Sequence, residues 1–249
     1  MSTSASPAEP AAPEAGIPFR PAFVLVSALV FFTVFWYFGR KAFFLDHLVG
    51  VFPDTSLTPL YPFFYFCAMS VFYRTVLPVL CIKLVLKGRL RDFGFSPHGT
   101  WDGAWIYLVL FLCVVPLVWF ASTTAPFQAF YPQFREVIQG GQVLWEHVLA
   151  FELVYGLLFL SGESFWRGYL VFGLEPHLGK TGVLVMVIPY VMSHYEKPFL
   201  ETMGAVITGT VLGLLALRHR NFWLGVVVHW SVAMLMDVLA LRALGVEIV

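Results

Sequence analysis

Apolar runs long enough to cross a lipid bilayer recur along the chain. A membrane-spanning helix needs about 20 mostly apolar residues, and seven stretches come near that length. In chain order they are residues 21–38, 61–86, 104–121, 143–174, 182–195, 199–217 and 222–244. This pattern predicts an all-α fold, a polytopic transmembrane helix bundle of about seven spans.

The composition supports this prediction. Hydrophobic residues make up 59% of the 249 residues and charged residues 12%, whereas about 25% of an average soluble domain is charged. The formal net charge is zero, so no global field favours nucleic acid, and we expect membrane lipid as the surroundings. The Ala-, Pro- and Ser-rich residues 1–19 predict a disordered N-terminal tail. Residues 20–249 then form a single integral membrane domain.

The distribution of basic residues predicts an orientation. Lys87, Arg89 and Arg91 follow the second run, and loops rich in Lys and Arg stay in the cytoplasm. Alternation of the spans then places the N-terminus in the cytoplasm. Arg40 and Lys41 go against this assignment, because they fall on the outer side.

The fourth run carries an acid and a base, Glu163 and Arg167. They are four residues apart, so on a helix they share one face and can pair. An ionisable residue inside a membrane is costly and is a candidate for a functional site. The alternative interpretation is a structural ion pair that joins two helices.

Histidines occur in the fifth and seventh runs, His194 and His229. Counting about 1.5 Å per helical residue, both come to a depth similar to that of Glu163. A carboxylate in an apolar pocket can act as general base for water, and a histidine can donate to an oxyanion. This combination favours hydrolysis of an amide bond.

Two other chemistries compete with this hypothesis. Glu163, His194 and His229 form a zinc-type ligand set, but the His-Glu-x-x-His motif is absent and the three residues come from separate helices. Zinc-dependent hydrolysis therefore ranks second, after hydrolysis with Glu163 as general base. Serine chemistry ranks third because no Gly-x-Ser-x-Gly motif is present.

Three segments resemble, in this order, the motifs of the CPBP family (CAAX protease and bacteriocin-processing enzymes, also called Abi). They are Glu163-Ser-Phe-Trp-Arg167, Tyr190-Val-Met-Ser-His194 and the apolar lead into His229. The family consists of glutamate-type intramembrane proteases. The likeness covers about the last hundred residues, so a CPBP-like catalytic core is expected in the last four runs, at about residues 143–245.

The resemblance implies an intramembrane endopeptidase, a peptide hydrolase without a cofactor. Glu163 would activate water, Arg167 would orient Glu163, His194 would share the role of base, and His229 would stabilise the oxyanion. The substrate would be a membrane-anchored or hydrophobic peptide.

Two departures from the family pattern favour other functions. Gly162 stands where the family has its first glutamate, and Ala233 stands where it has an asparagine. A catalytically degenerate membrane scaffold or peptide-binding protein of the same family is therefore the main alternative. A proton-coupled transporter is the third hypothesis, although the two halves of the chain show no inverted repeat.

The pattern His194-x-x-Lys197-Pro-x-x-Glu201 resembles the myxosortase-like subgroup of the family. That subgroup is linked to the sorting of exported proteins, so the likeness implies removal of C-terminal anchors at a bacterial inner membrane. Further ionisable residues lie in the apolar runs, and we expect Glu152 and Asp237 to be structural. Arg74 either marks a break in the second run or pairs with Asp237.

Overall fold

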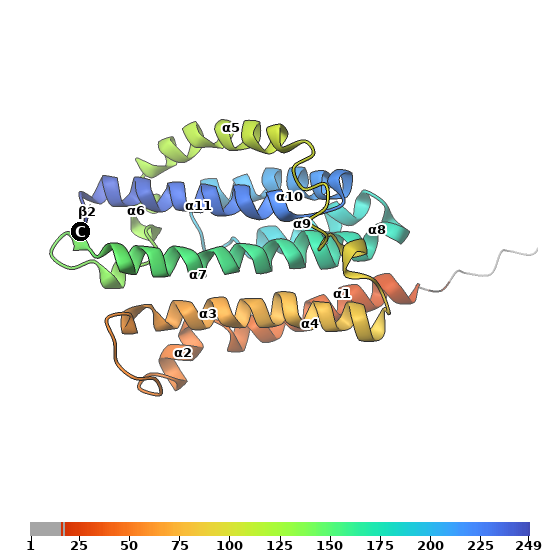
Figure 1. Ribbon diagram of the computed structural model, residues 1–249, viewed down its shortest axis with the longest axis horizontal. Coiled ribbons are helices and arrows are strands. Elements are labelled where there is room, and N and C mark those ends of the chain that lie inside the picture. The colour runs from red at the N-terminus through yellow and green to blue at the C-terminus, as the bar shows by residue number, and fades with distance from the viewer. Residues whose placement is uncertain (1–15, 17) are drawn as a thin grey trace, which may run out of the picture.

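The computed structural model describes Gly16 and residues 18–249, which form helices joined by short connections (Figure 1). The predicted N-terminal tail lies almost wholly outside the described residues, and Phe19 already begins α1. The helical elements are α1 (Phe19–Phe38), α2 (Lys41–His47), η1 (Thr58–Leu60), α3 (Tyr61–Val71), η2 (Phe72–Val76), α4 (Leu77–Leu80), η3 (Cys81–Val85), η4 (Leu90–Phe93), α5 (Ala104–Ser122), α6 (Ala125–Phe130), η5 (Arg135–Val137), α7 (Trp145–Glu163), η6 (Ser164–Val171), α8 (Phe172–Leu178), α9 (Thr181–Met192), α10 (Phe199–His219) and α11 (Trp223–Leu244). The strands β1 (Gln142–Val143) and β2 (Glu247–Ile248) pair in parallel.

Among the described residues, six helical stretches are long and apolar enough to cross a membrane. They are Phe19–Phe38, Thr58–Val85, Ala104–Ser122, Trp145–Leu178, Phe199–His219 and Trp223–Leu244. The all-α polytopic prediction is confirmed. The predicted fifth span is the exception: α9 has 12 residues and therefore covers about 18 Å, which is less than the hydrocarbon thickness of a bilayer.

The outer surface of the bundle is apolar. Side chains such as Leu112, Trp119 and Ile207 are more than half exposed, and a water-soluble protein rarely exposes apolar area over whole helices. These faces suit contact with lipid chains. The protein is an integral membrane protein.

The helix α7 runs through the middle of the bundle, between α3 and α11 (Figure 1). Phe63 of α3 stacks on Phe151 of α7 at a centroid distance of 4.4 Å. Further along, Trp166 of η6 packs in one buried cluster with Met186 of α9. Polar groups on this central helix are therefore enclosed by protein.

The central helix changes its winding at the predicted motif. The α-helix α7 ends at Glu163, and η6, which follows directly, is π-helical. A second π-helical segment, η2, contains Arg74 and packs against η6. The run Thr58–Val85 is thus continuous, and the suggested break at Arg74 is wrong. Because π-helical turns inside α-helices are often found at functional sites, the contact between η2 and η6 is a candidate location for such a site.

Candidate functional site

Glu163 and Arg167 form the predicted pair. Nη1 of Arg167 lies 2.9 Å from Oε1 of Glu163, and both side chains are at most 2% exposed. An ion pair removed from water is maintained only when its partners stay together. The prediction that the two residues share a face and pair is confirmed.

His229 contacts the same carboxylate oxygen from α11. Its Nδ1 lies 2.8 Å from Oε1 of Glu163, and its Nε2 lies 3.2 Å from the hydroxyl of Tyr190 on α9. Because a carboxylate only accepts hydrogen bonds, Nδ1 carries the proton, and in a neutral ring Nε2 accepts from the Tyr190 O–H. The His229 side chain is 25% exposed. It is the accessible part of an otherwise enclosed network that joins three helices.

Two glycines allow this close approach. A Cβ at Gly225 would lie 2.7 Å from Oε2 of Glu163, and a Cβ at Gly209 would lie 2.8 Å from the ring of Tyr190. Any larger residue at either position would displace the neighbouring functional side chain. Oε2 of Glu163 is buried and has no hydrogen-bond partner among the described residues, so it is a free acceptor.

His194 lies beside this network and makes no direct contact with Glu163. It follows the end of α9, and its Nδ1 lies 2.8 Å from the carbonyl oxygen of Tyr190. Nδ1 therefore donates, which leaves Nε2 as the acceptor of the neutral ring. The His194 and Tyr190 rings are 4.7 Å apart. Of the three groups that the sequence predicted to converge, Glu163 and His229 are in direct contact. His194 is connected to them indirectly, because it bonds the backbone of Tyr190 and the Tyr190 hydroxyl bonds His229.

Within the part of the chain that the structure describes, no three His, Cys, Asp or Glu side chains are arranged to hold a metal ion. The alternative zinc set was Glu163, His194 and His229. Two of these residues meet, but the third ligand is turned to the backbone of Tyr190. The donor set therefore fits a metal ion poorly.

The remaining ionisable residues of the spans have other partners. Asp237 accepts a hydrogen bond of 3.3 Å from the backbone N–H of Gln133 and forms no ion pair with Arg74 in the described structure, so the suggested pairing is wrong. Glu152 accepts from Nε1 of Trp230 at 3.4 Å. Both fit the expected structural role.

Glu201, from the subgroup-like pattern, ties α10 to the connection after α6. It forms an ion pair of 2.6 Å with Lys197 and accepts a hydrogen bond of 2.7 Å from the hydroxyl of Tyr131. The pattern His194-x-x-Lys197-Pro-x-x-Glu201 thus stabilises the turn between α9 and α10.

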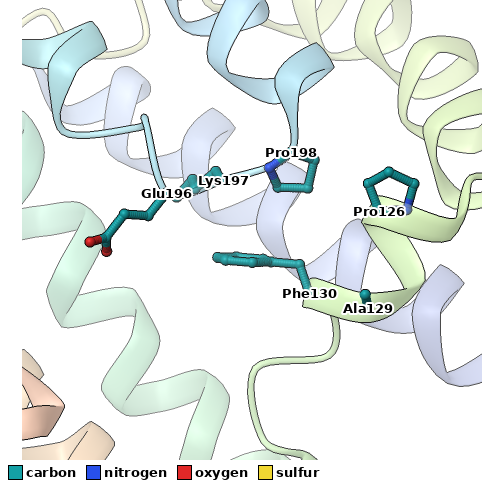
Figure 2. Close-up of a pocket in the computed structure, with 6 residues that line it drawn as sticks. All are labelled: Pro126, Ala129, Phe130, Glu196, Lys197 and Pro198. Carbon is teal, nitrogen blue, oxygen red and sulfur yellow. The ribbon is translucent and has the colours of Figure 1, made fainter.

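Two cavities lie away from Glu163. One, of about 280 Å³, lies between α6 and the turn after α9, and Figure 2 shows the ring of Phe130 across from Lys197 and Pro198. The other, of about 500 Å³, lies between α2 and the start of α3. Neither cavity is lined by Glu163 or His229. The carboxylate is closed off in this conformation, and His229 is its nearest accessible neighbour.

Tyr190 is the site residue that the sequence reasoning missed. It entered only as the first letter of the motif that ends in His194. The available signal was its spacing, because a residue four before His194 on a helix shares its face. The side chain bonds His229, and its ring lies under the guanidinium of Arg167 at 4.5 Å.

A comparison with protein families matches the segment that contains these site residues. Residues 144–235 match the family model described as type II CAAX prenyl endopeptidase Rce1-like. The matched segment contains Glu163, Arg167, His194 and His229, and it falls inside the predicted core. The match confirms the resemblance drawn from the three motifs. No curated protein and no solved structure matches the chain.

Proposed function

We propose that this membrane protein is a glutamate-type intramembrane endopeptidase, because residues 144–235 match the family model described as type II CAAX prenyl endopeptidase Rce1-like. The single observation that supports this most is the shared carboxylate. Oε1 of Glu163 is held by Arg167 and by His229 at 2.9 and 2.8 Å, while Oε2 has no hydrogen-bond partner in the described part of the chain. A carboxylate held by one oxygen and free at the other is oriented as a general base.

The reaction proceeds in two proton transfers. Oε2 of Glu163 takes a proton from water as the water oxygen attacks the carbonyl carbon of the scissile amide. The resulting tetrahedral intermediate collapses when Glu163 returns the proton to the leaving nitrogen, which gives a carboxylic acid and an amine. Arg167 keeps the carboxylate in place during both transfers. A positioned acid–base group of this kind contributes about 10²- to 10⁴-fold to the rate.

The two histidines have different roles beside this carboxylate: His229 stabilises the oxyanion, and His194 assists the base. To donate from Nε2, His229 must carry a proton on both ring nitrogens, and the second proton comes from water at the 25% exposed side chain. The Nε2–H then donates to the oxyanion, while the Tyr190 hydroxyl oxygen accepts from the same N–H and keeps the ring oriented. His194 shares the base role through its Nε2, which makes no hydrogen bond to the described residues.

The substrate class follows from the surroundings of the site. A carboxylate enclosed by apolar helices is reached by a peptide that enters from the bilayer. The likeness of His194-x-x-Lys197-Pro-x-x-Glu201 to the myxosortase-like pattern supports removal of C-terminal anchors from exported proteins at a bacterial inner membrane. The basic residues Lys87, Arg89 and Arg91 support an N-terminus in the cytoplasm.

The test uses the full-length protein in liposomes with two probes. One is a soluble reporter that ends in a single apolar helix and a short basic tail, and the other is a farnesylated peptide that ends in C-a-a-X. We expect cleavage of at least one probe, and a loss of about 100-fold or more in Glu163→Gln. Glu146→Gln is the matched control, because Glu146 is exposed on the same helix.

Full cleavage by Glu163→Gln would show that the glutamate mechanism is wrong. The second candidate function, a peptide-binding scaffold, is favoured by Gly162 and by the 2% exposure of the Glu163 side chain. It predicts that the wild-type protein binds both probes and cleaves neither.

A further inference from the structure

Arg74 lies against the position where the family has its first glutamate. A Cβ at Gly162 would lie 2.8 Å from Nη2 of Arg74. The guanidinium therefore fills the space beside α7 that a side chain at 162 would enter. Arg74 comes from η2, and residue 162 directly precedes Glu163, so a second cation borders the proposed active site.

One hydroxyl bonds this guanidinium, and hydroxyl pairs join its helical run to the central helix. Nη1 of Arg74 donates to Oγ of Ser70 at 3.1 Å, and that oxygen lies 2.7 Å from Oγ of Ser161. One turn further along, Thr75 and Ser164 are bonded at 2.7 Å. These contacts join η2 and α3 to the central helix before and after Gly162. Arg74 is thus positioned by side chains that carry no charge.

The positive charge of Arg74 has no ion-pair partner among the described residues. Within the described part of the chain, no carboxylate oxygen lies within 4.0 Å of its guanidinium nitrogens, and its buried Nε makes no hydrogen bond. Glu163 is already shared between Arg167 and His229. A cation withdrawn from water is costly unless an anion compensates it. The cluster of one acid and two arginines therefore has a surplus positive charge.

We propose that Arg74 binds an anionic oxygen of the substrate. This inference rests on the proposed function and identifies a substrate-binding group that the three motifs do not contain. A guanidinium presents N–H groups in a planar fork that fits a carboxylate, and a positioned donor in a dry site also stabilises an oxyanion. The anionic oxygen thus belongs either to the C-terminal carboxylate of the peptide or to the tetrahedral intermediate.

The experiment compares Arg74→Gln with the wild-type protein in nanodiscs. The probes are the farnesylated peptide ending in C-a-a-X with a free carboxylate and the same peptide as its C-terminal amide. Binding is measured by fluorescence anisotropy and cleavage by chromatography. Arg242→Gln is the control, because Arg242 is exposed at the far end of α11.

The two sources of the anion give different results. If Arg74 binds the carboxylate, the wild-type protein binds the acid about 10-fold or more tightly than the amide, and Arg74→Gln binds both equally. If Arg74 binds the oxyanion, Arg74→Gln keeps both Kd values and loses about 10²- to 10³-fold in kcat on a cleaved probe. If the Kd, KM and kcat of Arg74→Gln all match those of the wild-type protein, the proposal is overturned.

A second variant keeps the test valid if Arg74→Gln does not fold. Gly162→Glu places a carboxylate next to Nη2 of Arg74, so it neutralises the guanidinium and should cause the same loss while the protein stays folded. A rise in turnover in Gly162→Glu would instead show that a free Arg74 is not required. The two proposals fail separately, because loss of activity in Glu163→Gln with an unaffected Arg74→Gln contradicts this inference alone.

Discussion

Nδ1 of His229 lies 2.8 Å from Oε1 of Glu163, although 66 residues separate them in the chain. Arg167 contacts the same oxygen. One carboxylate oxygen thus joins α7, η6 and α11, while the second oxygen has no hydrogen-bond partner among the residues that the structure describes. This arrangement couples the stability of the bundle to its proposed chemistry.

Removal of the carboxylate should destabilise the protein. Glu163→Ala leaves Arg167 enclosed without its partner, and breaking a buried ion pair in this way costs about 3–5 kcal/mol. We expect a clearly lower Tm in detergent, measured by differential scanning fluorimetry. Glu146→Ala, at an exposed position of the same helix, should leave Tm unchanged. Equal Tm values for the two variants would show that the pair does not stabilise the fold.

Gly225 should be required for activity because of its missing side chain. A Cβ there would lie 2.7 Å from Oε2 of Glu163, so Gly225→Ala blocks the oxygen that takes the proton. We expect cleavage in liposomes to fall by about 10-fold or more, because a displaced general base loses its proton-transfer geometry. Gly204→Ala is the control, since no atom lies within 4 Å of its Cβ position. Unchanged cleavage by Gly225→Ala would exclude Oε2 as the base.

Tyr190 should act by orienting His229. Tyr190→Phe removes the hydroxyl that bonds Nε2 of His229, and the loss of one such hydrogen bond costs about 0.5–1.5 kcal/mol. We expect cleavage to fall by about 2- to 13-fold, with KM nearly unchanged, in an assay of initial rates. Tyr195→Phe, at an exposed position in the turn after α9, should retain the wild-type rate. Identical rates for both variants would contradict this role.

Cleavage should not depend on a bound metal ion. The described residues bring two of the three alternative zinc ligands together and leave His194 apart. We therefore expect full activity after treatment with 1,10-phenanthroline or EDTA. Inhibition that added zinc reverses would favour the zinc alternative.

The sequence predicted the helical bundle and the Glu163–Arg167 pair because both depend on local periodicity. Apolar runs of bilayer length predict spans, and a spacing of four predicts a shared face. The end of α9 was less well predicted, because the fifth span was expected to reach Tyr195 while the helix ends at Met192. His194 therefore lies beyond the end of the helix, where the rise of about 1.5 Å per helical residue that was used to estimate its depth no longer applies.

Contacts between helices were the part that the sequence could not supply. A pairing of Arg74 with Asp237 was one of two alternatives, yet Arg74 faces Gly162, while Asp237 bonds the backbone of Gln133. Which faces meet depends on helix rotation and on small residues such as Gly162 and Gly225, and a single sequence does not specify either. The Tyr190 hydroxyl bond was missed for the same reason.

The central claim is that Glu163 and His229 act as one unit in hydrolysis, and a double-mutant cycle tests it most directly. Initial rates are measured in liposomes for wild type, Glu163→Gln, His229→Gln and the double variant. Residues that act together give strongly non-additive losses, so we expect the double variant to be about as slow as the slower single variant. Losses that multiply would show that the two residues contribute independently and would contradict the account.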